Sequence, residues 1–521
     1  MRNMAQKDKI RSIEKPEMPI GTLHGQDIDD FFNKSIAYHK EVFENTLSEY
    51  EPFDLYSNWK TFVRNLDEFI NIPFEIDIDD KKKYLSLGLN LMEENNLPNF
   101  KYILDLLENK FNKKISQRFM QIAMMSSAIN ASYIKCGVYN LQGNSLNLDN
   151  IENAIDFFQS RRLYYVSVLP LIPQMAKGSK KIKYIDLLNF FQYCIDSCLV
   201  GITSAYFKLL INKCISDYEI TSDGTIAKGN FDFSHLESFF LEPERLSLLD
   251  QLELRPDIVI QKTMLPKSDN KIFSFSETAN AMSLYEGAFH KYKLDKSSIF
   301  KELSLFLYDI AIYIEDDFNI VIEETDFEKI SQKYKSLKLS IQTTDYFVAL
   351  NSKAPFQKVG NYYFSTVVLL TRFVTNTLST SLLKNRTFQI HSGFVFEDKV
   401  ASILKKFNFE LTDIKRINRK EFDLVTIKNG EIYNFQCKNN YYDISTVDLD
   451  YNKIAKLNNR LCNYYEKALT KEINRENLIK DKLGIQQIYH FVISRYPVIT
   501  RNEKIINFNR LENWLIDKNL I

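Results

Sequence analysis

Apolar side chains recur with a helical period along most of this chain, and few residues interrupt the pattern. Spacings of three and four residues place apolar side chains on one face of an amphipathic helix. The 521 residues include only 14 glycines and 12 prolines, well below the usual frequencies of about 7% and 5%. Long helices are therefore predicted, and a collagen-like or largely disordered chain is excluded. The clearest runs are Ile28, Phe31, Phe32, Ile36 and Phe43, then Leu55, Trp59, Phe62, Val63, Leu66 and Phe69.

The pattern divides the chain into four parts. Residues 1–20 read as a flexible tail, and residues 21–315 as a helical region without a fixed-period repeat. Residues 316–385 are predicted to be a mixed α/β connecting segment, and residues 386–521 an α/β domain. The predicted helices of the helical region are 82–96, 99–112, 114–135, 149–161, 184–213, 277–291 and 298–315. The predicted elements of the connecting segment are strands at 318–323 and 355–364 and a helix at 364–383.

Several classes of protein lack support in the sequence. No apolar run was expected to reach the 18 or so residues that cross a bilayer, and the first 19 residues lack the apolar core of a secretory signal. Six cysteines form no paired framework, which predicts a reducing, cytoplasmic location without a membrane segment. Cys194, Cys198 and Cys214 could approach a metal, but no histidine lies near them, so core packing is predicted instead. Motifs for nucleotide binding or zinc proteolysis are absent from the sequence.

The charge of the chain is unevenly distributed. Lys and Arg total 67 and Asp and Glu total 67, so the net charge is zero. Residues 391–521 contain 22 basic and 17 acidic residues, a net charge of +5, which leaves −5 in residues 1–390. A basic C-terminal part is compatible with a polyanionic partner at that end.

One carboxylate stands out in the C-terminal part. Residues 391–407 predict a helix that begins just after Gly393 with Ser392 as its N-cap. Glu397 is expected on the apolar face of this helix, which is unusual because Glu is rarely buried without a partner. The predicted apolar face consists of Phe394, Val400, Ala401, Leu404 and Phe407.

Polar residues follow this helix at the ends of predicted strands. A strand at 409–417 and a basic turn at 418–420 precede a hairpin at 421–440, whose Asn429-Gly430 turn is a strong hairpin signal. Period-two alternation puts Phe422 with Leu424 on one face and Asp423 on the other. Gln436 and Lys438 then share a face of the second strand, so Asp423, Gln436, Lys438 and Glu397 are expected to converge. Such oxygens suit Mg²⁺, and a lysine beside them can orient water and offset charge in phosphodiester hydrolysis.

The order of these residues resembles the PD-(D/E)xK superfamily of nucleases, which have the restriction-endonuclease-like fold. The helix with Glu397, the strand with Asp423 and the strand with Gln436-Cys437-Lys438 resemble its Mrr-like branch, where Gln often replaces the second acid. This chain has Glu421-Phe422 in place of the family's proline, and Gln436 removes one negative charge from the metal site. A helix at about 450–480, a strand at 486–497 and a helix at 508–518 complete the resemblance, which covers only the C-terminal quarter.

The resemblance implies an endonuclease that uses Mg²⁺, with Mn²⁺ as a substitute, to cut DNA. Glu397, Asp423 and Gln436 would bind the metal, all four site residues would be catalytic, and Lys453, Lys456 and Arg460 would bind nucleic acid. The helical region would recognise a substrate, bind an activating partner or hold a homo-oligomer together, and defence of a bacterium against foreign DNA is one such role. Two alternatives remain open: a non-catalytic nucleic-acid-binding or scaffold protein with a degenerate nuclease fold, and a helical interaction protein capped by its C-terminal domain.

Overall fold

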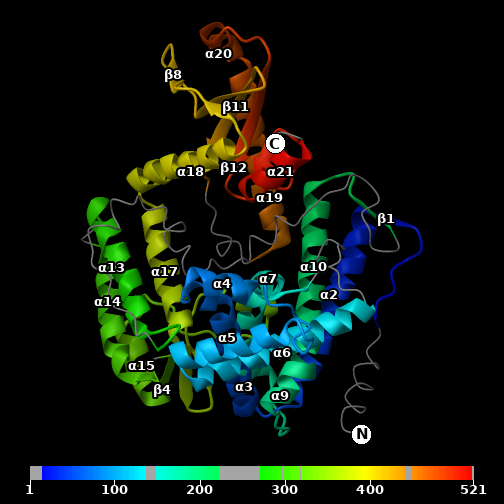
Figure 1. Cartoon of the computed structure of the whole chain (residues 1–521), viewed down its shortest axis with the longest axis vertical. Helices are drawn as coiled ribbons and strands as arrows, with labels where there is room; N and C mark the ends of the chain where they lie inside the picture. The colour runs from blue at the N-terminus through cyan, green and yellow to red at the C-terminus, as the bar shows by residue number, and fades with distance from the viewer. Residues whose placement is uncertain are drawn as a thin grey trace.

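The computed structural model describes residues 15–136, 148–221, 270–294, 297–316, 318–440 and 449–518. Most of the predicted tail, residues 1–14, lies outside these ranges. The described residues form a large helical body, a smaller unit around a four-stranded sheet, and a C-terminal α/β module at one end of the long axis (Figure 1). The multidomain layout predicted from the sequence, helical first and α/β last, is confirmed at this level.

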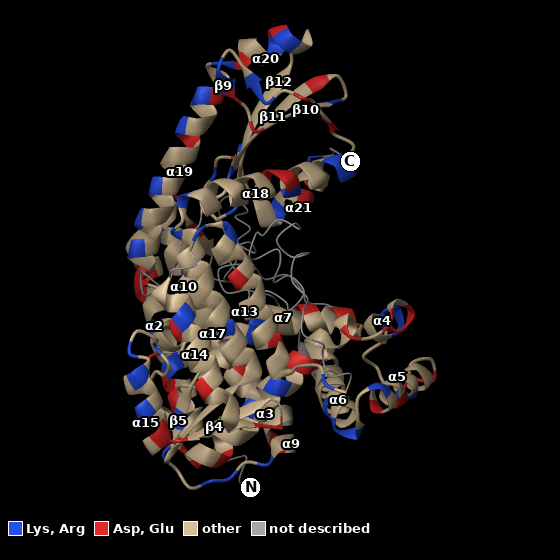
Figure 2. Cartoon of the chain, turned by 90° about the vertical axis from the view of Figure 1, so that its left-hand side faces the viewer, with Lys and Arg blue, Asp and Glu red and all other residues tan. Residues whose placement is uncertain are grey.

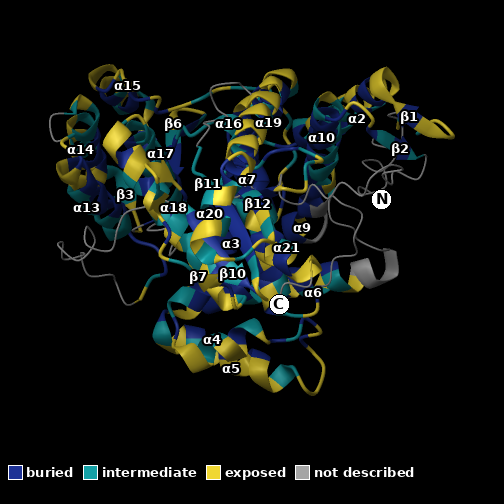
Figure 3. Cartoon of the chain, turned by 90° about the horizontal axis from the view of Figure 1, so that it is seen from above, coloured by how far each residue is buried: buried dark blue, intermediate teal, exposed yellow. Residues whose placement is uncertain are grey.

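The helical body follows the predicted periodicity at most positions, but the helix predicted at 82–96 is wrong. Helix α4 (Ile78–Leu85) stops early, and turns continue until Leu97, where α5 begins with proline in its first turn. Gly88 and several asparagines in between favour turns over helix. Helices α4 and α5 project from the body with many exposed residues (Figures 2 and 3). The other long body helices are α2 (Gly25–Ser48), α3 (Pro52–Asn71), α5 (Leu97–Lys110), α6 (Lys113–Cys136), α7 (Ile151–Val168) and α10 (Gln192–Cys214).

Helix α10 is unusually apolar, and the sequence analysis did not predict an apolar run of this length. Its segment Cys194–Cys214 is long and apolar enough to cross a membrane by length and composition, but 67% of the apolar window is buried inside the protein. Helix α2 packs along one side, and α19 (Tyr451–Ile473) packs on another. A helix enclosed by neighbours is apolar around most of its circumference. Cys198 on this helix is a buried free thiol, as predicted.

The connecting segment forms an antiparallel sheet in the order β3 (Ile314–Glu315), β4 (Asn319–Glu323), β6 (Tyr362–Thr366) and β5 (Gln357–Val359). The predicted hairpin is confirmed, with Gly360 at φ +59° in its turn. The core of this unit is shared with α13 (Phe275–Lys291), α14 (Ser298–Ile310) and α17 (Val367–Leu383). Its hydrophobic core therefore extends across the predicted boundary at residue 315.

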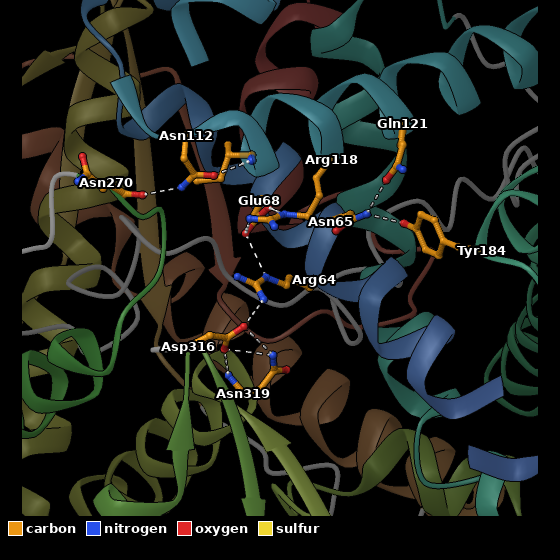
Figure 4. Close-up of polar contacts among 11 residues, drawn as sticks. Arg64, Asn65, Glu68, Asn112, Arg118, Gln121, Tyr184, Asn270, Asp316 and Asn319 are labelled. Atoms are coloured by element: carbon orange, nitrogen blue, oxygen red, sulfur yellow. Dashed lines mark hydrogen bonds and ion pairs between the residues drawn. The ribbon is translucent and has the colours of Figure 1, made fainter. Parts of the chain in front are cut away.

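A polar cluster joins this sheet to the helical body (Figure 4). Glu68 on α3 accepts hydrogen bonds from Arg118 of α6 (Nη2 to Oε1, 2.8 Å) and from Arg64 (Nε to Oε1, 3.2 Å). Arg64 also reaches Asp316, and its guanidinium lies 4.2 Å from the centroid of the Phe318 ring. Because the buried Glu68 carboxylate is paired with arginines, the cluster has a clear structural role as an anchor between the two units.

The C-terminal module is built on a mixed five-stranded sheet. Its strand order is β13 (Ile505–Asn507), β12 (Ile488–Ser494), β11 (Glu431–Lys438), β10 (Leu424–Lys428) and β7 (Glu410–Leu411). β11, β12 and β13 are parallel, whereas β10 is antiparallel to both of its neighbours. Helices α18 (Arg386–Lys406) and α21 (Leu511–Asp517) pack on one face, and α19 and α20 (Glu476–Leu483) pack on the other. The predicted mixed sheet flanked by helices is confirmed.

One predicted element of the module, the strand at 409–417, is wrong. Only Glu410 and Leu411 form a strand paired with β10, and the backbone N–H and the side chain of Thr412 still donate to the carbonyl of Val425 where this strand ends. The chain then forms a separate hairpin from β8 (Arg416–Ile417) and β9 (Lys420–Glu421). The strand predicted at 486–497 and the helix predicted at 508–518 are confirmed with shorter bounds.

Candidate active site

The hairpin predicted at 421–440 is the base of the site. β10 and β11 are antiparallel, and their turn has positive φ at Asn429 (+53°) and Gly430 (+79°). Leu424 pairs with Phe435, which brings Asp423 beside Gln436. The amide of Gln436 donates a hydrogen bond to Oδ2 of Asp423, and the backbone N–H of Cys437 donates another at 2.8 Å. The predicted proximity of Asp423 and Gln436 is therefore confirmed.

The predicted alternation of side chains between the two faces of the sheet is wrong just before β10. Phe422 packs with Val425 and Ile432, whereas Leu424 packs with Phe435 on the other face of the sheet. A bend at Asp423 separates β9 from β10, so Phe422 and Leu424 do not share a face. The bend places the Asp423 carboxylate at the entrance of the strand rather than within the ladder.

Glu397 comes from α18, whose predicted start and face need correction. The helix begins at Arg386, because the side chain of Asn385 caps it by accepting from the N–H of Phe388. Ser392 is thus inside the helix, and Phe394 is 46% exposed. Glu397 is half-buried. It follows Phe396 in the chain and lies beside the stripe of buried side chains on α18, not at the centre of that stripe. The buried stripe has a spacing of four residues: Phe388, Ser392, Phe396, Val400 and Leu404.

The two carboxylates lie in a shared electrostatic environment. Burial and the charge of Asp423 raise the pKa of Glu397 to about 7, with Lys415 and Lys438 acting in the opposite direction. Burial also raises the pKa of Asp423, although Lys438 and the two hydrogen bonds to Oδ2 oppose the shift. A carboxylate whose proton affinity is raised by a neighbouring carboxylate, as that of Glu397 is by Asp423, favours a bound cation nearby.

Lys438 ends β11 with its ammonium 6.0 Å from the centroid of the Tyr464 ring of α19. Two neighbours hold this strand end in place. Asn439 donates to Ser392 of α18 at 3.0 Å and accepts from Arg495 at 3.0 Å, and the N–H of Arg495 donates to the carbonyl of Lys438 at 3.0 Å. Burial lowers the pKa of Arg495 to about 10.

Sequence reasoning missed Lys415. Its ammonium donates to the backbone carbonyl of Asp423 at 2.8 Å and lies 3.8 Å from Oε2 of Glu397. This residue precedes β8, within a segment that was predicted to be a strand, and no local pattern indicates that it folds back onto Asp423. It supplies a second positive charge beside the two carboxylates.

A buried polar network lies behind the site. Asn434 of β11 donates to Oε2 of Glu472 at 3.0 Å, and Arg475 donates to the same carboxylate, also at 3.0 Å. The Arg475 guanidinium covers the Phe422 ring at 4.4 Å, so the network fixes the residue next to Asp423.

The three residues predicted to bind nucleic acid lie on α19. Lys453, Lys456 and Arg460 are exposed and follow one another along the helix. The start of α19 packs into the body, with Tyr451 against Tyr206. In the described structure Lys453 and Lys456 make no hydrogen bond or ion pair with the four site residues, so the structure does not bring them into the site.

The donor set fits a hard divalent cation. Both hydrogen bonds to the Asp423 carboxylate end on Oδ2, which leaves Oδ1 for a metal, and Glu397 offers a second carboxylate. Gln436 and backbone carbonyls can add neutral oxygens, the ligand type that Mg²⁺ prefers. In the ranges that the structure covers, no three His, Cys, Asp or Glu side chains group as a metal site.

The chain was compared with known proteins in three ways. No family model, no curated protein and no solved structure matches it.

Proposed function

We propose that the C-terminal module is a metal-dependent nuclease that hydrolyses phosphodiester bonds in DNA. The observation that supports it is the convergence of Glu397, Asp423, Gln436 and Lys438 from a helix and a hairpin. A carboxylate pair can hold a divalent cation, an amide oxygen can add a neutral ligand, and a lysine can offset the charge that develops on the phosphate during hydrolysis.

Each residue has a separate task in this reaction. Asp423 and Glu397 hold Mg²⁺ or Mn²⁺, and Gln436 fixes the Asp423 carboxylate and can add its own amide oxygen. The bound metal would polarise the phosphoryl group and lower the pKa of water. Lys438 orients the attacking water and offsets the charge that develops on the phosphate. Lys415 keeps Asp423 in place through its backbone carbonyl.

The helical body is proposed to recognise a substrate, bind an activating partner or hold a homo-oligomer together, with defence against foreign DNA as the context. Docking of α19 on α10 supports a link between the two parts, because Ile454 and Ala455 belong to the main core of the body. Cleavage of both strands by a protein with one site of this kind would require two copies.

The direct test offers the full chain supercoiled plasmid, linear duplex, single-stranded DNA and RNA with Mg²⁺, Mn²⁺ or EDTA. Metal-dependent cleavage of DNA supports the proposal, and the preferred substrate identifies the class of nucleic acid. Binding without cleavage under every condition, with no effect of Asp423→Asn on function in cells, would favour the non-catalytic alternative.

A further inference from the structure

A basic hairpin stands beside the site, and apart from Lys415 the proposed chemistry does not use its residues. β8 and β9 form a two-stranded ribbon that is separate from the main sheet. It lies next to α20 at the end of the module farthest from the body (Figure 1), and basic residues colour β9 in Figure 2. Its four basic residues are all exposed: Lys415, Arg416, Arg419 and Lys420.

The turn of this hairpin keeps an arginine where glycine is favoured. Asn418 and Arg419 have φ of +47° and +64°. Two-residue hairpin turns with positive φ at both positions strongly prefer Asn-Gly. The hairpin between β10 and β11 follows that rule with Asn429-Gly430, whereas the turn between β8 and β9 places an arginine at positive φ. A strained residue held at an exposed position is a sign of function.

The base of the hairpin is fixed, so its tip has a defined position. The N–H of Phe422 donates to the carbonyl of Lys415 at 3.1 Å and closes the loop. Ile417 packs against a cluster that includes Ile414, Phe422 and Ile479 of α20. Arg416 pairs with Glu421 across the two strands, whereas the side chains of Arg419 and Lys420 make no hydrogen bond or ion pair with any described residue.

From these observations we infer that the β8–β9 hairpin lies in a groove of duplex nucleic acid and guides a phosphate to Asp423. A two-stranded ribbon fits the major groove of DNA, which is about 12 Å wide. Arg419 and Lys420 supply the positive charge that meets the phosphates. Lys415 connects the ribbon to the site, because it contacts both Glu397 and Asp423. The inference rests on the proposed nuclease function of the same site.

The test measures binding without cleavage. The full chain in EDTA is titrated into a labelled short duplex and into a single strand of the same length, by fluorescence anisotropy at several salt concentrations. Arg419→Gly and Lys420→Ala are compared with the wild type. Lys504→Ala is the matched control, since this exposed lysine lies just before β13, at the opposite edge of the sheet.

The Arg419→Gly variant distinguishes an effect on duplex binding from an effect on folding. Glycine relieves the strained φ, so the melting temperature is expected to equal or exceed that of the wild type, while duplex affinity falls several-fold. Loss of one phosphate contact should also lower the slope of log K against log salt by about 0.9. Lys420→Ala should weaken duplex binding in the same way, and Lys504→Ala should leave it unchanged.

Three results would overturn the inference: no duplex binding by the wild type, unchanged duplex affinity in both hairpin variants, or an equal loss for duplex and single strand. The cleavage assay is read separately. Hairpin-dependent binding without any cleavage would count against the nuclease function and leave only the duplex-binding role of the hairpin, whereas cleavage with hairpin-independent binding would refute only this inference.

Discussion

The backbone N–H of Cys437 donates a hydrogen bond to Oδ2 of Asp423 at 2.8 Å. The strand that carries Lys438 therefore also fixes the carboxylate proposed to bind the metal. Because this contact uses the backbone, it depends on the β10–β11 register rather than on the identity of a side chain. The amide of Gln436 donates to the same oxygen. Neither of these two hydrogen bonds therefore uses Oδ1 of Asp423.

Metal binding should stabilise the module. Saturating Mg²⁺ or Mn²⁺ relieves the repulsion between Glu397 and Asp423, and a ligand at 100 times its Kd adds about 2.7 kcal/mol to the stability of the state that binds it. We expect a higher melting temperature with metal than with EDTA, measured by differential scanning fluorimetry. The increase should vanish in Asp423→Asn; an equal increase in that variant would place the metal elsewhere.

Gln436→Glu should strengthen the metal site and weaken the metal-free fold. A new carboxylate beside the half-buried Asp423 repels it, so the melting temperature in EDTA should fall. With metal bound, the added charge should lower the Mg²⁺ concentration for half-maximal stabilisation about tenfold, equivalent to about 1.4 kcal/mol. Gln436→Leu is the control, because it removes the amide without adding charge. A Gln436→Glu variant that resembles the control in metal affinity would argue against Gln436 as a neighbour of the metal.

The buried pair Glu472–Arg475 should matter more for stability than an exposed pair. The side chains are 1% and 5% exposed, and removal of one partner leaves an uncompensated buried charge, at a cost of about 3–5 kcal/mol. Arg475→Met should therefore lower the urea midpoint strongly, and Glu472→Gln with Arg475→Met should recover part of the loss. Lys518→Met, which breaks an exposed pair with Glu503, should leave the urea midpoint almost unchanged.

Stability should decrease at acidic pH partly through His39. This α2 residue lies against Gly201 of α10, and burial followed by the charge of Lys15 lowers its pKa from 6.5 to about 4. Because the unfolded chain takes up a proton at higher pH than the folded protein, the stability is present above pH 6.5 and is lost as the pH falls towards 4. His39→Gln should flatten the pH dependence of the melting temperature in this window. An unchanged pH profile would show that protonation of the His39 ring does not lower the stability of the folded protein.

Sequence reasoning predicted the elements that depend on local signals. The Asn429-Gly430 turn fixes the β10–β11 register, so the proximity of Asp423 and Gln436 followed from alternation and turn chemistry. Long apolar periodicity likewise predicted most body helices. These features need no knowledge of distant contacts.

Most of the errors arose where distant contacts decide. The Asn385 cap that starts α18 is a local signal that the sequence analysis overlooked, but the buried stripe of this helix depends on packing against the sheet, which leaves Phe394 exposed and Phe396 buried. Lys415 reaches Asp423 only because the chain bends back through the β8–β9 hairpin. No local pattern in residues 409–417 distinguishes that hairpin from a continuous strand.

The most direct test of the account is a time course of supercoiled plasmid cleavage with Mg²⁺ for the wild type, Asp423→Asn, Lys438→Met and Lys504→Ala. We expect the wild type and Lys504→Ala to cut at similar rates and to stop with EDTA. Asp423→Asn and Lys438→Met should be at least about 100-fold slower while their melting temperatures in EDTA show that they are folded. Metal-dependent cleavage at the wild-type rate by either site variant would contradict the account.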